Sequence, residues 1–198
     1  MVRRLCILTF FLLAGGLMAA YGQEKLQTAA KGSLQAICED SAGIQWAVTD
    51  AGEILRSADG SGWNVLDFNA EYAGYYPQMD FRTVAAGGGS VMVAGLDTDG
   101  HLAVYISSRG SVWSARSLEY SEGGERHVLD VTPSSLSYDP LRDSFFLCGS
   151  GGTLFEMPGC SHCNSLTRYP TDTLYVRIQA GFNALLLGSG GFRLVESL

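Results

Sequence analysis

Four similar segments recur along the chain, and this repetition limits its possible folds more than any other feature. Each segment has an apolar run, a short turn rich in Gly, Asp, Ser or Thr, and a second run in which apolar and polar residues tend to alternate. The segments begin at Ile44, Val91, Ser144 and Ala184. Their turn glycines, at intervals of 48, 52 and 39 residues, are Gly52, Gly100, Gly152 and Gly191. A period of roughly 40 to 50 residues is typical of propeller blades and related arrays.

Each segment is predicted to be a β-hairpin, because a two-residue turn of the primed types needs the positive φ that glycine adopts without cost. Strand-like runs precede the hairpins at 33–38, 80–86, 134–139 and 174–180, and follow them at 63–68, 113–120 and 164–169. The predicted fold is therefore all-β, a β-propeller-like array of about four four-stranded antiparallel blades. Its units span about 33–69, 80–120, 134–169 and 174–198.

The fourth unit has only three predicted strands. Residues 24–30 could supply the missing outer strand and close the ring, which would remove the exposed sheet edges that favour aggregation. The alternatives are an incomplete propeller, or an open array that completes itself by oligomerising.

The first 22 residues have the pattern of a secretory signal peptide. Arg3 and Arg4 precede an apolar run over residues 5–17, and small residues follow it up to Gly22. This run is shorter than the roughly 18 to 20 residues of a membrane-spanning helix. The pattern predicts export to the periplasm or the extracellular space, a single domain over residues 23–198, and no stable membrane anchor after cleavage.

The charge balance argues against two classes of partner. The formal net charge is −7, and it becomes −9 when residues 1–22, with two arginines and no acidic residue, are removed. Nucleic acids and anionic membranes both require clustered Lys and Arg, whereas the basic residues here are scattered. The acidic segment at 119–130 is predicted to be a solvated loop.

A shared turn motif follows the first two hairpins, with the pattern Ser-x-[Asp/Arg]-Gly-Ser-x-Trp. Its structural positions are Ser57, Asp59, Gly60 and Trp63 in the first copy, and Ser107, Gly110 and Trp113 in the second. The motif resembles the Asp-box of the bacterial-neuraminidase repeat, although Arg109 replaces the aspartate in the second copy. The longer stretch QWAVTDAGEILRSADGSGW, residues 45–63, resembles the repeat of Ycf48-like propellers. The resemblance implies that these turns lie at the rim, away from the ligand face, and hold the blades together.

Two functions compete within this resemblance. Asp-box enzymes include sialidases, glycoside hydrolases that use three arginines, a tyrosine nucleophile activated by a glutamate, and an acid/base aspartate. The segment FRTV at 81–84, which contains Arg82, only faintly resembles their Phe-Arg-Ile-Pro signature, and the chain is much shorter than a sialidase. We therefore expect a non-catalytic binding module without a cofactor. The likeness to Ycf48 implies a role in assembling an envelope or membrane complex.

Three tyrosines on the loop at 69–80 are the candidate partner-binding residues: Tyr72, Tyr75 and Tyr76. Tyrosine combines a large contact area with a hydrogen-bonding tip and loses little conformational entropy on binding, which suits protein or glycan partners. The alternative is that these side chains only cap a contact between blades.

The cysteines favour a disulfide over a metal site or a redox pair. Cys160 and Cys163 form a single Cys-x-x-Cys without a second ligand pair, which is weak evidence for zinc. We expect a local disulfide between them and no metal. Cys38 and Cys148 lie within apolar strands and are expected to be buried.

Overall fold

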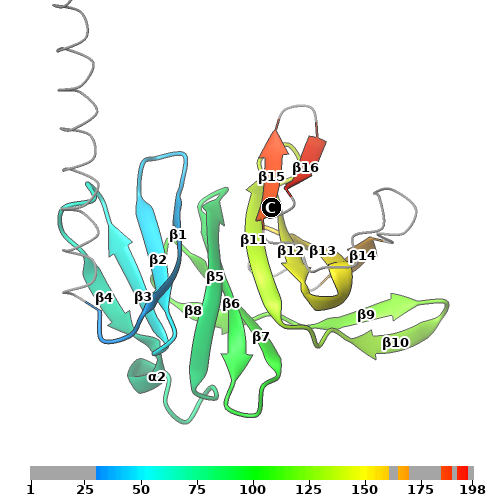
Figure 1. Ribbon diagram of the computed structural model, residues 1–198, viewed down its shortest axis with the longest axis horizontal. Coiled ribbons are helices and arrows are strands. Elements are labelled where there is room, and N and C mark those ends of the chain that lie inside the picture. The colour runs from blue at the N-terminus through cyan, green and yellow to red at the C-terminus, as the bar shows by residue number, and fades with distance from the viewer. Residues whose placement is uncertain (1–29, 161–164, 170–183, 189–190, 196–198) are drawn as a thin grey trace, which may run out of the picture.

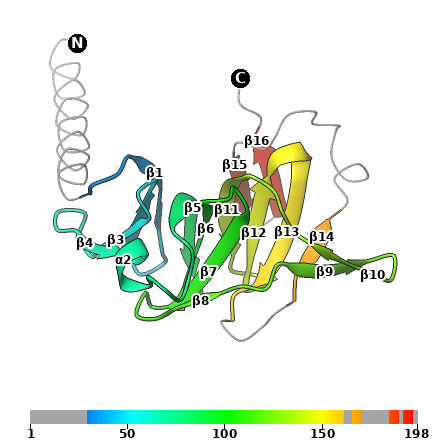
Figure 2. The ribbon, with the colours of Figure 1, turned by 90° about the horizontal axis from the view of Figure 1, so that it is seen from below.

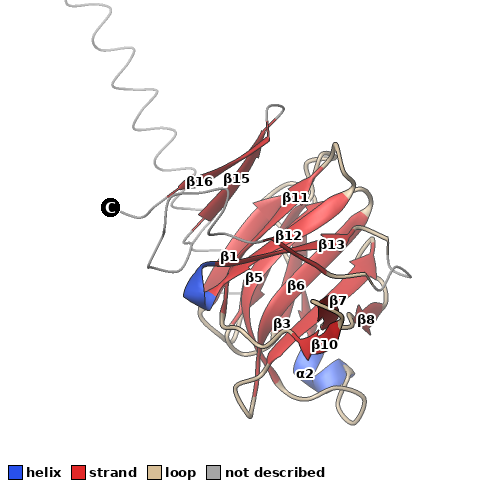
Figure 3. Cartoon of the chain, turned by 90° about the vertical axis from the view of Figure 1, so that its right-hand side faces the viewer, coloured by secondary structure: helices blue, strands red, loops and turns tan. Residues whose placement is uncertain are grey.

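The protein is a fan of antiparallel sheets in the computed structural model, which describes residues 30–160, 165–169, 184–188 and 191–195. Three four-stranded sheets stand side by side as blades, and a fourth unit contributes a pair of strands (Figure 1). Helix is confined, within these residues, to α2 (Phe68–Glu71) and the single 3₁₀ turn η1 (Ser150–Gly152), and strands dominate the side view (Figure 3). The predicted all-β, propeller-like class is confirmed.

The strands of each blade pair in sequence order. Blade 1 contains β1 (Leu34–Glu39), β2 (Gln45–Thr49), β3 (Glu53–Ser57) and β4 (Asn64–Asp67). Blade 2 contains β5 (Met79–Gly87), β6 (Ser90–Asp97), β7 (Leu102–Ser108) and β8 (Trp113–Ala115). Blade 3 contains β11 (Pro133–Asp139), β12 (Ser144–Gly149), β13 (Thr153–Pro158) and β14 (Thr167–Tyr169). The fourth unit contains β15 (Ala184–Gly188) and β16 (Gly191–Val195).

The described units form an open array. β5 lies between β1 and β11, so the first strands of the three blades are neighbours, and β15 of the fourth unit lies against β11. Blade 1 is at one end of the fan and the fourth unit at the other (Figure 1). The predicted strand at 174–180, the signal peptide at 1–22 and all of the proposed closing segment except Ala30 lie outside the described residues. No helix within the described residues is long and apolar enough to cross a membrane.

Two apolar cores hold the blades together, and blade 2 contributes to both. Between blades 1 and 2 the core includes Trp46, Phe68, Val93 and Trp113. Between blades 2 and 3 it includes Met92, Ile106, Leu147 and Phe155. Val93 and Met92 are adjacent on β6 and point to opposite faces, as the two-residue period of a strand requires. The central blade is thus covered on both sides.

The first three hairpin turns differ from the predicted two-residue type, whereas in the fourth two residues separate the paired Gly188 and Gly191, as predicted. The N–H groups of Gly52 and Gly100 donate to the carbonyls of Thr49 and Asp97, at 3.2 and 3.0 Å. Each glycine is thus the last residue of a four-residue turn, with φ of +74° and +83°. In the third turn Gly151, not Gly152, has the positive φ, and Gly191 is the first residue of β16. Glycine is needed because it continues the chain in the left-handed region after the turn.

The acidic segment at 119–130 is a hairpin, so its assignment as a loop was wrong. β9 (Glu119–Glu122) pairs with β10 (Glu125–Val128), and Gly123 and Gly124 form the two-residue turn with φ of +62° and +88°. The hairpin projects from the connection between blades 2 and 3 (Figures 1 and 2). The predicted strand at 113–120 is therefore divided, with β8 ending at Ala115.

Candidate functional site

The tyrosine loop begins with a short helix that fixes its path. Oδ1 of Asp67 accepts a hydrogen bond from the N–H of Ala70 at 3.1 Å, which caps the N-terminus of α2. The N–H groups of Tyr75 and Tyr76 both donate to the carbonyl of Tyr72, at 3.0 and 3.1 Å. Residues 72–76 are therefore held by their own backbone.

Tyr72 and Tyr76 connect this loop to blade 2. The hydroxyl of Tyr72 accepts from the N–H of Trp113 at 3.1 Å, and that of Tyr76 donates to the Trp113 carbonyl at 3.3 Å. Trp113 begins β8, the outermost strand of blade 2, so the two hydroxyls satisfy backbone groups on the free edge of that sheet. Both rings also stack on Phe68, with centroids 4.7 and 5.9 Å away.

Tyr75 has a different environment. Its side chain is 84% exposed, whereas Tyr72 and Tyr76 are half-buried. The structure therefore brings two of the three candidate tyrosines together as a cap on the contact between blades and leaves the third in solvent. Partner binding by Tyr72, Tyr75 and Tyr76 remains a prediction, in which Tyr75 is the residue available for contact.

The first Asp-box turn is organised by two side chains. Ser57 Oγ accepts from the N–H groups of Asp59 and Gly60, at 3.4 and 2.9 Å. The Asp59 carboxylate accepts from the N–H of Ser61 at 2.8 Å, that of Gly62 at 3.1 Å and the Ser61 hydroxyl at 2.7 Å. The bonds from Ser61 and Gly62 stabilise the charged form and lower the pKa of Asp59 to about 2. All of these contacts lie within the turn.

The second turn is stabilised differently because Arg109 replaces the aspartate. Arg109 has a φ of +59°, and its N–H donates to the Gly89 carbonyl at 3.0 Å. The Ser107 hydroxyl is buried without a hydrogen-bond partner among the described residues. Gly110 lies so close to Trp46 of blade 1 that an added Cβ would be 2.2 Å from the indole ring. This turn is thus held by packing between blades.

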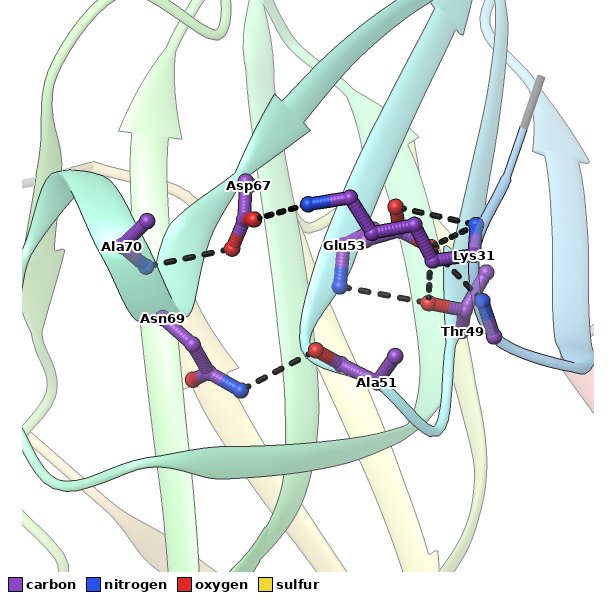
Figure 4. Close-up of polar contacts among 8 residues, drawn as sticks. Lys31, Thr49, Ala51, Glu53, Asp67, Asn69 and Ala70 are labelled. Carbon is purple, nitrogen blue, oxygen red and sulfur yellow. Dashed lines mark hydrogen bonds and ion pairs between the residues drawn. The ribbon is translucent and has the colours of Figure 1, made fainter.

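A buried glutamate that the sequence analysis did not identify anchors the start of blade 1 (Figure 4). The Glu53 carboxylate accepts from the N–H groups of Lys31 and Gly32 and from the Thr49 hydroxyl, with shortest distances of 2.9, 3.0 and 3.0 Å. Lys31 Nζ lies 2.8 Å from Asp67 Oδ2. That hydrogen-bonded pair raises the pKa of Lys31 and lowers the pKa of Asp67. The sequence signal was a lone glutamate at the start of a core strand.

Asn69 links the turn between β2 and β3 of blade 1 to the start of β5. Its Nδ2 donates to the carbonyls of Ala51 and Met79, at 3.1 and 3.0 Å, and its Oδ1 accepts from the Met79 N–H at 2.7 Å. Every polar atom of the amide is thus used for structure, as Figure 4 shows for the bond to Ala51. The residues in this view act as braces and offer no free acid or base.

The enzyme hypothesis requires a tyrosine beside a glutamate, and one such pair exists in blade 3. The Tyr169 hydroxyl donates to Glu156 Oε2. Burial and this hydrogen bond raise the pKa of Tyr169 to about 12. Arg82, in the FRTV segment, is the extra residue of a β-bulge and pairs with Asp80. Arg142 and Arg168 pair with other carboxylates, Asp139 and Glu122.

The cysteines divide into bonded and free. Cys160 is disulfide-bonded, and Cys163, its predicted partner, lies outside the described residues. Cys38 and Cys148 are free; Cys148 is buried as expected, whereas Cys38 is half-buried, and burial raises the pKa of each thiol to about 12. Such thiols are protonated and unreactive at neutral pH. The described residues contain no cluster of three or more His, Cys, Asp or Glu side chains that could hold a metal ion.

One shallow, mainly polar hollow of about 300 Å³ lies beside the projecting hairpin. It is lined by Ser117, Glu119, Tyr120, Ser121 and Arg126. Tyr120 stacks on His127 across the hairpin, with ring centroids 5.3 Å apart. The hollow lies on a different part of the chain from the tyrosine loop, and it contains a single acidic side chain, so it lacks the carboxylate pair of a glycosidase.

Comparison with solved structures confirms the propeller fold. Ycf48 from Cyanidioschyzon merolae is similar over 84% of this chain and 51% of its own, with a TM-score of 0.54 and 14% identity. Ycf48 bound to D1 peptide is similar over 84% of this chain and 48% of its own, with a TM-score of 0.55 and 13% identity. The extracellular domain of a putative hybrid two-component system from B. thetaiotaomicron is similar over 83% of this chain and 22% of its own, with a TM-score of 0.55 and 11% identity.

The chain therefore spans about half the length of the two Ycf48 structures. Its sequence matches no protein-family model and no curated protein. The resemblance to Ycf48-like propellers is confirmed at the level of the fold, which does not by itself establish a function.

Proposed function

We propose that this chain is an exported, non-catalytic propeller module that binds a protein partner through the loop that carries Tyr75. The exposure of Tyr75 on a fixed loop carries this proposal. The fold is that of Ycf48 structures, one of which was solved with a D1 peptide bound. Export rests on the predicted signal peptide at residues 1–22. A role in assembling an envelope complex follows from the same likeness.

The loop is suited to binding because it is already ordered. Hydrogen bonds within residues 72–76 and from two tyrosine hydroxyls to Trp113 fix the backbone on either side of Tyr75. An anchor that is held in its bound position loses little entropy when a partner docks. Aromatic residues of this kind contribute most of the binding energy at many interfaces.

We favour a protein partner over a glycan, because the exposed Tyr75 side chain offers one hydroxyl and little other polar surface for sugar hydroxyls.

The test compares Tyr75→Ala with a matched control, Leu141→Ala, which shortens an exposed leucine on blade 3. A partner captured from the envelope fraction would be purified and its Kd measured by calorimetry. We expect Tyr75→Ala to weaken binding roughly 30-fold, equivalent to about 2 kcal/mol for an anchor residue, without changing the Tm. Leu141→Ala should bind as the wild type does. Equal affinities for wild type and Tyr75→Ala would refute the proposal.

The non-catalytic part of the proposal has its own measurement. We expect no hydrolysis of fluorogenic sialosides or other glycosides by the purified protein. Turnover that was lost in Tyr169→Phe or in Arg82→Ala would instead establish the glycoside hydrolase alternative.

A further inference from the structure

One face of blade 1 has the residues of a contact between blades but no described blade against it. Ile37, Ala47, Leu55 and Val65 lie directly opposite one another on β1 to β4 and form an apolar row. They point away from the core shared with blade 2, which takes the alternate residues such as Trp46. Trp63 and Leu34 pack on the middle of the row. We call this surface the outer face.

The equivalent surface of blade 2 shows what such a face does. The two Asp-box turns align Leu55 with Tyr105, since each lies two residues before the motif serine. Pairing across the strands then aligns Ala47 with Val93 and Ile37 with Val84. In blade 2 these residues, together with Trp113, are buried in the core shared with blade 1.

Blade 3 repeats the arrangement. Its row of directly paired residues, Leu136, Leu147 and Phe155, is buried in the core shared with blade 2. In both contacts within the chain, the row of one blade is therefore covered by the blade that precedes it in sequence. The outer face of blade 1 is the corresponding row of the first blade.

The exposed fractions show that the two ends of the row are uncovered, whereas Ala47 and Leu55 in its middle are buried beneath Leu34 and Trp63. Ile37 is 53% exposed, whereas its equivalent Val84 is 3% exposed. Val65, at the other end of the row, is 39% exposed. Trp63 is half-buried, whereas Trp113 is fully buried. Apolar rows of this kind are normally covered by another part of a protein.

We propose that a second copy of this chain covers the outer face with its fourth unit, β15–β16, so that two copies complete one propeller ring. The cover over such a row in blades 2 and 3 is a blade, which makes a propeller unit the fitting occupant.

The geometry of the fan supports a closed pair. Blade 1 and the fourth unit lie at opposite ends of the array (Figure 1). In a two-fold dimer the first blade of each copy would meet the fourth unit of the other, so the same contact would form twice and the ring would close. Both end faces of the array would then be covered.

The test is the mass of the purified protein in solution, measured by light scattering and sedimentation at tens of micromolar. We expect twice the mass of one chain. Ile37→Lys should give the mass of one chain, because a charge would be buried at one end of the contact. Leu141→Lys is the matched control on blade 3, where the leucine is 73% exposed, and it should remain a dimer.

Other outcomes would overturn the inference. A wild-type protein with the mass of one chain, or an assembly larger than two copies, would exclude the two-copy ring. So would an Ile37→Lys variant that stays dimeric. Circular dichroism would show that Ile37→Lys is folded, and Val65→Lys provides a second variant on the same face. Tyr75→Ala should stay dimeric, so this test does not depend on partner binding.

Discussion

Asp59 shows how one surface carboxylate can define a turn. Its oxygens accept three hydrogen bonds from the two residues that follow Gly60. These bonds favour the ionised form, and the pKa falls from an ordinary value of 3.8 to about 2. The sequence motif predicts such bonds, because Asp and Ser bond to nearby backbone groups whatever the rest of the fold does.

The first prediction concerns the pH dependence of this turn. Because the pKa of Asp59 is lower in the folded protein, its stabilising effect is fully present above pH 3.8 and is lost as the pH falls through 2. Asp59→Ala should therefore lower the Tm at pH 7, and the Tm difference from wild type should shrink between pH 4 and pH 2. Thermal unfolding followed by circular dichroism measures both.

The control for this prediction is Asp99→Ala, which removes the same charge from a turn where the side chain is exposed. It should leave the Tm nearly unchanged at every pH. A Tm difference for Asp59→Ala that stayed constant down to pH 2 would show that the carboxylate is not ionised in the way described.

Other residue roles could not be read from the sequence. Tyr72 and Tyr76 cap Trp113, which lies 41 and 37 residues further along the chain. Glu53 holds Lys31 and Gly32, which precede it by 22 and 21 residues. A one-dimensional pattern does not specify which backbone groups meet a side chain across such distances. The polar character of these residues was visible, but not their partners.

At the level of elements, the turns carry contacts between blades as well as reversing the chain. Gly110 and Gly100 both have positive φ, +76° and +83°. An added Cβ at Gly110 would meet Trp46 of blade 1, whereas at Gly100 it would meet nothing within 4 Å. Substitutions at these two glycines therefore distinguish two costs: backbone strain, which applies at both, and overpacking, which applies only at Gly110.

The second prediction uses this matched pair. Gly100→Ala should cost about 1 kcal/mol of unfolding free energy, for the left-handed backbone alone. Gly110→Ala should cost roughly 2–4 kcal/mol, because overpacking against Trp46 adds to the same backbone term. Urea unfolding curves measure both. Equal costs would mean that the second turn does not brace the two blades.

The sequence predicted most hairpins because each strand buries a face and thus shows an apolar pattern. The hairpin of β9 and β10 was not predicted, because its residues are mostly exposed and polar and therefore show no apolar periodicity. Its signal was the Gly123–Gly124 pair, which suits a two-residue turn. The first three repeat hairpins were assigned the wrong turn length for a related reason, since composition shows that glycine is needed but not at which turn position.

At the level of the whole molecule, stability should be graded from the centre of the fan outwards. Residues 90–95 of β6 are all buried, because blade 2 packs on both sides. The hairpin of β9 and β10 has two strands and exposed side chains. Local opening requires less free energy where little apolar surface is buried.

The third prediction is the order of hydrogen exchange that follows. Amides of Ser90–Asp97 should be the slowest to exchange, and those of Glu119–Val128 the fastest among the strands described. Mass spectrometry of peptic peptides gives this order directly. Similar exchange in the two regions would indicate that the array opens as one cooperative unit.

The number of blades and the openness of the array followed from sequence only in part. About four four-stranded blades were predicted, because each of the four turn glycines marks one repeat, and the described residues contain three of them as four-stranded sheets. Whether the ring closes depends on contacts between its first and last units, and no repeat pattern encodes them.

The connector between the first two blades has a mechanical consequence. Phe68, in α2, is fully buried and contacts the rings of Tyr72, Tyr76, Phe81 and Tyr105. Phe68 thus anchors the connecting segment within the contact between the two blades that it links. A pulling force between these blades would have to extract that ring before the chain could lengthen. The contact between the two blades should therefore be mechanically rigid.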